Sequence, residues 1–221
     1  PANIKEMKDW NKKFTSPVTD DEVVTLLRLS AAIDELWEAQ IQLRKEVGTK
    51  TQDALSIFGY TDDAEDSHTT IRQKDKIFSE LYKSEHMRNA GPYARLKFAM
   101  DYWCALWFWP IDKADLLPTR SEFLFDMSLI LEGTMASVNV TDSVKGGQLS
   151  LFPTEIEQMA MDIIDTYGTD TIVDIPALRK QNPRLDLAAR IAEQNKFMHW
   201  ELEFADLFAE RGGFDLVIGN P

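Results

Sequence analysis

The chain has 221 residues, of which 44% are hydrophobic and 28% are charged, and its formal net charge is −13. This composition excludes a disordered or membrane-embedded chain and allows one large or two small domains with a sizeable core. Lysine and arginine, which a phosphate-binding surface needs in clusters, are scarce, so nucleic-acid binding by most of this surface is not expected.

Helix signals dominate the first part of the chain. Thr19 and Glu22 have the spacing of a capping box, in which each side chain bonds the other residue's backbone N–H. The apolar residues that follow at helical spacing are Val23, Leu26, Leu27, Ile33, Leu36 and Trp37. We predict a helix that runs to Val47 and stops at Gly48. The acidic residues 60–70 are predicted to form a solvated loop, because they lack the glycine and spacing of a calcium loop.

A second helix is predicted over residues 71–89, with Gly91 after it. Pro92 then begins a tryptophan-rich helix that Pro110 ends. Its apolar stripe, which we assign to core packing rather than to a ligand pocket, consists of Leu96, Ala99, Tyr102, Trp103, Leu106 and Trp107. Cys104, the single cysteine, is interpreted as a buried structural thiol in a reducing compartment.

Two further capping-box pairs, each predicted to begin a helix, are Thr119 with Glu122 and Thr154 with Glu157. Between these helices, residues 133–153 are rich in Gly, Ser and Thr and predict a long loop. Two short helices are predicted over residues 175–181 and 183–195. The fold class is therefore mainly α.

The one predicted strand lies at the C-terminal end of the chain, over residues 214–219. A single strand cannot form a sheet. It either pairs with residues 171–175 or belongs to a sheet whose other strands lie outside this sequence. We expect that the other strands of its sheet lie outside this sequence and that the chain is a piece of a longer protein. The strand should then lack its native pairing in this chain, because its sheet neighbours are absent.

Asn220 and Pro221 follow this strand directly. At the carboxyl end of a strand, the Asn side-chain carbonyl and a neighbouring backbone carbonyl can both accept hydrogen bonds from one amino group. Two such acceptors would orient a planar amine for methylation. The alternative is that Gly219, Asn220 and Pro221 form only a turn, since these residue types favour turns.

Residues 212–221 resemble the start of the Asn-Pro-Pro-aromatic motif of amino-group methyltransferases that use S-adenosylmethionine. The longer run 195–221 is similar to the large adenine-specific DNA methyltransferases of bacterial restriction and phage-defence systems, the Eco57I-like group. Residues 95–110 also resemble a helical region of those proteins. The resemblance implies a multi-helix domain inserted in an α/β methyltransferase, with residues 1–195 as the insert and 196–221 as the start of the catalytic segment.

The resemblance also implies roles for the last two residues. Asn220 matches the residue whose side chain receives the N6 amino group of a flipped adenine, and Pro221 matches the proline whose carbonyl assists. The second proline, the stacking aromatic and the Gly-rich loop for S-adenosylmethionine are not in this sequence. The parent is therefore expected to be a cytoplasmic bacterial enzyme that binds DNA through other parts, and this piece alone is expected to be inactive.

Two other functions stay open at this point. A protein-glutamine methyltransferase has a similar Asn-Pro-Pro-Tyr motif, although the long helical region argues against it. A non-catalytic helical module that binds a protein is the alternative outside enzymes. Bacterial proteins bind the sliding clamp of DNA polymerase through a short pentapeptide. That pentapeptide matches Gln148, Leu149, Ser150, Leu151 and Phe152. Local packing of these side chains against the next helix is the reading that we favour.

The three histidines, His68, His86 and His199, lack the spacing of metal ligands, so no metal is predicted. His199 lies in the run that carries the resemblance and could hydrogen-bond near an active site. A buried histidine with a structural hydrogen bond is the favoured interpretation.

Overall fold

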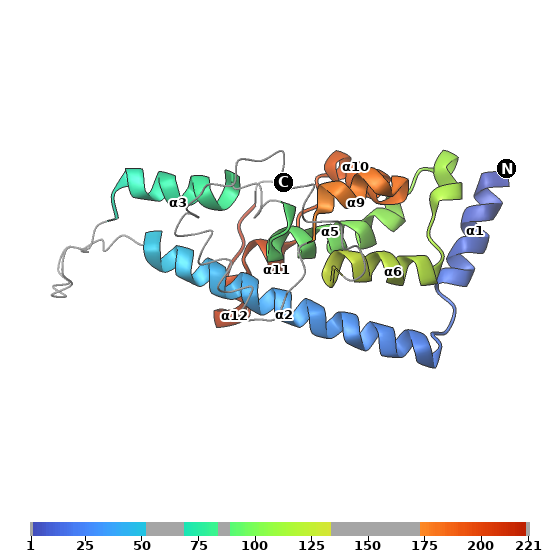
Figure 1. Cartoon of the computed structure of the whole chain (residues 1–221), viewed down its shortest axis with the longest axis horizontal. Coiled ribbons are helices and arrows are strands. Elements are labelled where there is room, and N and C mark those ends of the chain that lie inside the picture. Colours follow the sequence, from blue (N-terminus) through green and yellow to red (C-terminus); the bar gives the residue numbers. More distant parts are fainter. Residues whose placement is uncertain (1, 52–68, 84–88, 134–172, 220–221) are drawn as a thin grey trace, which may run out of the picture.

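The computed structural model describes residues 2–51, 69–83, 89–133 and 173–219, and all regular elements in those ranges are helices. The α-helices are α1 (Ala2–Phe14), α2 (Asp20–Thr51), α3 (Ile71–Lys83), α5 (Pro92–Ala105), α6 (Arg120–Leu131), α9 (Ile175–Gln181), α10 (Pro183–Asn195), α11 (Trp200–Glu203) and α12 (Ala205–Arg211) (Figure 1). Two 3-10 helices, η1 (Leu106–Phe108) and η2 (Ile111–Leu116), lie between α5 and α6. The prediction of a mainly α chain is confirmed for the described ranges.

Helix α5 lies at the centre of the fold and packs against α2, α6, α10 and α11. Its side chains Leu96, Ala99 and Tyr102 are buried. The 32-residue helix α2 runs along the lower edge of the molecule in Figure 1 and packs against α5, α6 and α12. The core is thus built around α5, with α2 on one side and α10 on another.

Both capping boxes that were predicted in the described ranges are present. The Thr119 N–H donates to Glu122 Oε2 at 2.7 Å, and the Glu122 N–H donates to Thr119 Oγ1 at 3.3 Å. Thr19 and Glu22 exchange the same two bonds at 2.8 and 3.3 Å. The hydrogen bond from the Thr119 backbone lowers the pKa of Glu122. The third pair, Thr154 with Glu157, lies outside the described residues, as do loop residues 134–153 with the pentapeptide 148–152.

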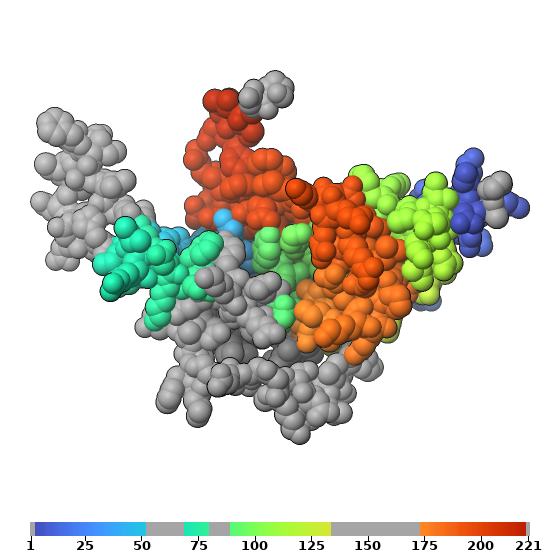
Figure 2. Space-filling view, turned by 90° about the horizontal axis from the view of Figure 1, so that it is seen from above, coloured from blue at the N-terminus to red at the C-terminus, as the bar shows by residue number. Residues whose placement is uncertain are grey.

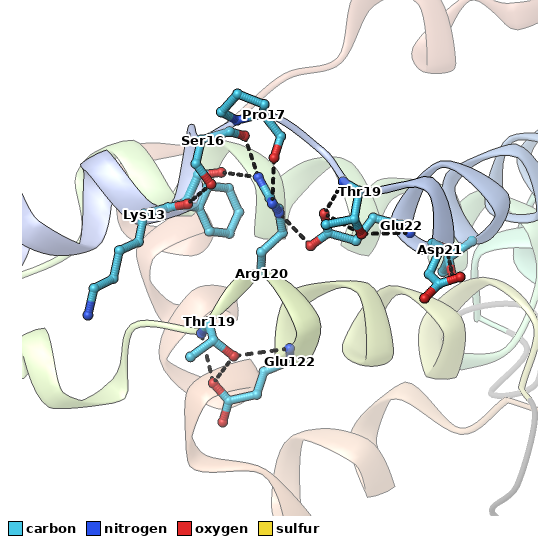
Figure 3. Close-up of polar contacts among 11 residues, drawn as sticks. Lys13, Ser16, Pro17, Thr19, Asp21, Glu22, Thr119, Arg120 and Glu122 are labelled. Carbon is cyan, nitrogen blue, oxygen red and sulfur yellow. Dashed lines mark hydrogen bonds and ion pairs between the residues drawn. The ribbon is translucent and has the colours of Figure 1, made fainter.

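Arg120, the first residue of α6, connects α6 to the turn between α1 and α2 (Figure 3). Its Nη1 donates to the carbonyl oxygens of Ser16 at 2.5 Å and Phe14 at 3.3 Å, and its Nη2 donates to Pro17 O at 3.1 Å. Its Nε donates to Glu22 Oε1 at 2.7 Å, and this bond lowers the pKa of the Glu22 carboxyl. One guanidinium therefore satisfies carbonyls at the end of α1 and a carboxylate at the start of α2.

A buried polar cluster joins α5, α6 and α10 at Asp126, which is 1% exposed. Its carboxylate accepts hydrogen bonds from the Tyr102 hydroxyl at 2.8 Å and from Asn182 Nδ2 at 3.2 Å. Arg184 Nε lies 3.0 Å from Oδ2 as an ion pair. Burial raises the pKa of Asp126, and the Tyr102 bond and the Arg184 charge offset this only in part. Removing the Asp126 carboxylate from water is unfavourable, and the hydrogen bonds and ion pair with specific partners on neighbouring helices offset this cost in part.

The predicted end of α2 at Gly48 is wrong, because the helix continues to Thr51. Gly48 does not have the positive φ that a left-handed helix cap requires. The predicted apolar stripe is also only partly buried: Leu36 is fully buried, whereas Leu27 is 67% exposed. The buried residues of α2 begin at Leu29, so the side chains of its first two turns are exposed or half-buried.

The tryptophan-rich helix begins at Pro92 as predicted, but two residues of its predicted core stripe lie on the surface. Trp103 and Trp107 are 46% and 63% exposed. Positions 96, 99, 102 and 106 recur at the helical period and share the buried face, while 103 and 107 lie beside it. Cys104 is half-buried rather than buried. Burial still raises the pKa of its thiol, which opposes a nucleophilic role.

The predicted helix over residues 71–89 is confirmed as far as Lys83, beyond which residues 84–88 are not described. The two short helices have the predicted bounds, and each begins with a side-chain cap. Asp174 accepts from the Ala177 N–H at 3.1 Å, and Asn182 accepts from the Arg184 N–H at 3.1 Å. The alternative strand partner, residues 171–175, is not a strand where it is described, since Ile175 begins α9.

Candidate functional site

The site predicted from the sequence, Asn220 and Pro221, lies just beyond the described residues, which end at Gly219. The structure therefore describes the segment that precedes these two residues, which we call the lead-in. This lead-in consists of α11, α12 and residues 212–219. Helix α11 packs against α5 and helix α12 packs against α2, so the lead-in is in contact with the helical body.

Four aromatic residues hold the start of the last segment. The ring of Phe214 lies 5.0 Å from that of Phe204, 5.7 Å from that of Phe208 and 6.0 Å from that of Trp200, all edge to face. Edge-to-face pairs at these distances are favourable beyond the apolar area that they bury. This aromatic cluster fixes the point at which residues 215–219 leave the helical body.

Two glycines make the turn that brings Phe214 into this cluster. Gly212 ends α12 with a φ of +74°, and Gly213 has a φ of +138°. Side chains rarely adopt these angles, because Cβ clashes with the backbone. A Cβ on Gly213 would make only an ordinary van der Waals contact with the Phe208 ring, at 3.4 Å, so the backbone angle is what favours glycine there. The positive φ angles therefore favour glycine at both positions where the chain reverses against α12.

The strand predicted over residues 214–219 is not formed in the described structure. Leu216, Val217 and Ile218 are instead 74%, 66% and 86% exposed. Three consecutive β-branched or large apolar residues need burial on both faces of a sheet to become a stable central strand. The described residues supply no such sheet, which is the physical reason for the irregular conformation.

His199 holds the start of the lead-in through a buried contact with α5. Its Nε2 lies 2.8 Å from Asp101 Oδ1, and both side chains are buried. Because an ionised carboxylate can only accept, the ring N–H is the donor. The second Asp101 oxygen accepts from Lys97 Nζ at 2.6 Å. The prediction of a hydrogen-bonded structural histidine is confirmed, and its partner is the acidic residue of the apolar stretch 98–110.

A cleft of about 990 Å³ lies beside this contact, between α2, α3, α5 and the C-terminal helices. Seen from above in Figure 2, α5 (green) lies between the α11–α12 segment (red) and α9–α10 (orange). The apolar wall of the cleft consists of Leu43, Val47, Ile77, Phe78, Phe98 and Ile175. Its volume is at the upper end of the range of small-molecule pockets.

Polar contacts across the cleft connect the lead-in to α2 and α5. The Tyr93 hydroxyl donates to Glu203, and Arg44 Nε donates to Asp206 Oδ1 at 2.7 Å. Burial alone would raise the pKa of Asp206, but the hydrogen bond and charge of Arg44 outweigh it, so this pKa is lowered. The rim of the cleft is therefore held by one charged pair and one hydrogen bond between separate helices.

Within the described ranges, no group of three or more His, Cys, Asp or Glu side chains is arranged to hold a metal ion. His68 and His86 lie outside those ranges, so the absence of a metal stays a prediction. None of the described helices has the length and apolar character to cross a lipid bilayer.

Comparison with family models, with curated proteins and with solved structures finds no match to this chain.

Sequence reasoning missed the pairing of Asp101 with His199 and the cleft beside it. One signal was available: a lone aspartate in the apolar stretch 98–110 must find a partner when it is buried. The identity of that partner was not predictable, because 98 residues separate the two positions.

Replacing His199 by alanine should lower the free energy of unfolding by about 2–3 kcal/mol, because a hydrogen bond to a buried charged group is lost. The neighbouring side chain of Met198 is 52% exposed, and Met198→Ala serves as the matched control with little expected effect. Urea denaturation measures both variants. Equal stability of the two variants would mean that the His199 contact does not hold the lead-in.

Proposed function

We propose that the chain is a helical part of an S-adenosylmethionine-dependent DNA adenine-N6 methyltransferase of a bacterial restriction-modification or phage-defence system. The resemblance of residues 195–221 and 95–110 to those enzymes supports this function. The observation that carries it is the C-terminal segment: an apolar run, exposed and unpaired in the described structure, that directly precedes Asn220 and Pro221. An apolar run of this kind fits a catalytic strand whose sheet neighbours come from other sequence.

We propose that the helical body fixes the position at which the catalytic strand, residues 214–219, begins. The His199–Asp101 contact anchors the start of the lead-in, and the aromatic cluster around Phe214 anchors it just before residues 215–219. Asn220 would accept the N6 amino group of an adenine that has left the base stack, and the Pro221 carbonyl would accept its second N–H. The two acceptors orient the amine and polarise its N–H bonds.

The described residues do not fit S-adenosylmethionine, whose site in such enzymes is a Gly-rich loop after a strand. The glycines of the described ranges lie within α2 at Gly48, before α5 at Gly91, after α6 at Gly133, and in the last segment at 212, 213 and 219. None of them follows a strand. Other sequence would hold the cofactor, which supplies the methyl group.

DNA would also be held mainly elsewhere. The net charge of −13 disfavours binding of this chain to DNA phosphates, so we assign DNA contact to other parts of the enzyme. The contact of residues 148–152 with a sliding clamp stays a prediction, because these residues lie outside the described structure.

A methyl-transfer assay on the full-length protein tests the proposed function. Radiolabelled S-adenosylmethionine is offered together with unmethylated bacterial genomic DNA, which contains a very large set of short sequences, and separately with a glutamine-containing translation-factor substrate. The label is expected in DNA, as N6-methyladenine after nuclease digestion. Label in the protein substrate would instead favour the glutamine methyltransferase, and label in neither would favour a non-catalytic helical module.

A further inference from the structure

The cleft contains a buried side-chain amide whose oxygen has no partner. Gln40 lines the cleft from α2 and is 4% exposed. Its Oε1 is buried and makes no hydrogen bond with the residues that the structure describes. Buried polar atoms are almost always hydrogen-bonded, because an unpaired buried carbonyl destabilises a protein. An exception on the wall of a cleft indicates a site for a partner that the described residues do not supply.

Gly48 lies on the same wall, two turns further along α2. A glycine inside a helix is unfavourable relative to alanine, so it needs a local reason. Packing does not supply one: a Cβ on Gly48 would have no heavy atom within 4 Å among the described residues. Its conformation does not supply one either, since its φ is not positive. The missing side chain leaves the cleft open at this point.

The electrostatics of the cleft favour a neutral or cationic occupant. Among the described residues that line it, the basic ones are Arg44, Lys74 and Lys97, and the acidic ones are Asp75, Asp101, Glu193, Glu203 and Asp206. Arg44 and Lys97 are already engaged with Asp206 and Asp101, so neither cation is available to pair with a bound anion. Phosphates and carboxylates are therefore poor candidates for this cleft.

We propose that the cleft binds a small molecule with a planar apolar body and a neutral or cationic N–H donor group, of the amide or amidine type. The donor group pairs with the Gln40 amide, which can turn about its last torsion to present oxygen to the cleft. The planar body packs on the apolar wall, where Phe78 and Phe98 supply aromatic faces. This site is independent of the methyltransferase proposal, since it uses neither Asn220 nor Pro221.

Three probes that share one ring test the ligand chemistry: benzamidine, benzamide and benzoate. Ligand-observed saturation-transfer NMR on the purified protein measures their binding. Benzamidine and benzamide are expected to bind with a Kd on the order of 1 mM, a value typical of fragments of this size. Benzoate should bind at least tenfold more weakly. The proposal is overturned if none of the three binds, or if benzoate binds as tightly as the other two.

The variant Gln40→Leu removes the amide and keeps a side chain of similar volume. Binding of benzamide is expected to weaken at least fivefold. The melting temperature should rise by about 2–4 °C, because a buried unpaired oxygen is removed. A purely structural glutamine would give a fall in melting temperature, and that outcome, or unchanged binding, would refute the proposed role of Gln40.

A pair of substitutions at Gly48 tests the location. Leucine and alanine both favour the helix, so Gly48→Leu and Gly48→Ala should each fold at least as stably as the parent protein. Only the leucine side chain reaches into the cleft, so Gly48→Leu should abolish benzamide binding while Gly48→Ala retains most of it. Equal binding by the two variants would place the probe elsewhere and overturn the assignment.

Discussion

Replacement of Asp126 by alanine is expected to lower the free energy of unfolding by about 3 kcal/mol or more. The substitution removes the carboxylate that accepts from Tyr102 and Asn182, and it takes away one of the two acidic partners of Arg184. Tyr102 is fully buried, so its hydroxyl would have no water to replace the lost acceptor. Urea denaturation, followed by far-UV circular dichroism, measures the change.

The variant Asp126→Asn separates the hydrogen bonds from the charge. Because burial raises the pKa of Asp126, the ionised form is held at a cost, and the neutral amide should be tolerated better than alanine. The control is Asp215→Ala, which removes an exposed carboxylate paired with Arg211 and should leave stability unchanged. If Asp126→Ala unfolds at the same urea concentration as this control, the cluster does not stabilise the fold.

Replacement of Asn220 by alanine in the full-length protein should reduce the rate of methyl transfer to DNA by about 100-fold or more. Alanine offers no acceptor to orient the adenine amine, and the loss of one preorganised hydrogen-bonding group typically has an effect of this size. The rate constant is measured under single-turnover conditions, so that product release does not mask the chemical step. DNA affinity, measured by fluorescence anisotropy, should change little.

The matched control is Asn195→Ala, which removes another asparagine near the lead-in. Its Nδ2 donates to the Ile191 carbonyl within α10, a contact with no part in the proposed chemistry. This variant should keep most of the parental rate. A folded Asn220→Ala enzyme that is as active as the control would remove the assignment of Asn220 and leave the turn as its only role.

The features that were predictable from the sequence are local ones. The capping boxes at Thr19 and Thr119 involve residues three positions apart, so short spacing alone identifies them. The bounds of α9 and α10 follow from Pro at the second or first helical position and from capping side chains. A glycine is less decisive: it permits the left-handed end of a helix without requiring it, and α2 therefore continues through Gly48.

The features that were not predictable depend on which helix faces meet. An apolar stripe in α5 includes both buried and exposed positions, and only the arrangement of α2, α6 and α10 decides that Tyr102 is buried while Trp103 is on the surface. The cleft is of the same kind, because its walls come from helices far apart in the chain. For Asn220 and Pro221, in contrast, the hypothesis of a catalytic role comes from the sequence motif alone.

The contacts of Arg120 have a consequence for how this protein can vary. In the turn between α1 and α2, the guanidinium bonds main-chain oxygens, at Phe14, Ser16 and Pro17 (Figure 3). Main-chain oxygens are the same whatever side chain a residue carries. These three bonds therefore tolerate a change of side chain at positions 14, 16 and 17, whereas an inserted or deleted residue would move the carbonyls away from Arg120. For the contacts of Arg120, the length of the loop therefore matters more than its sequence.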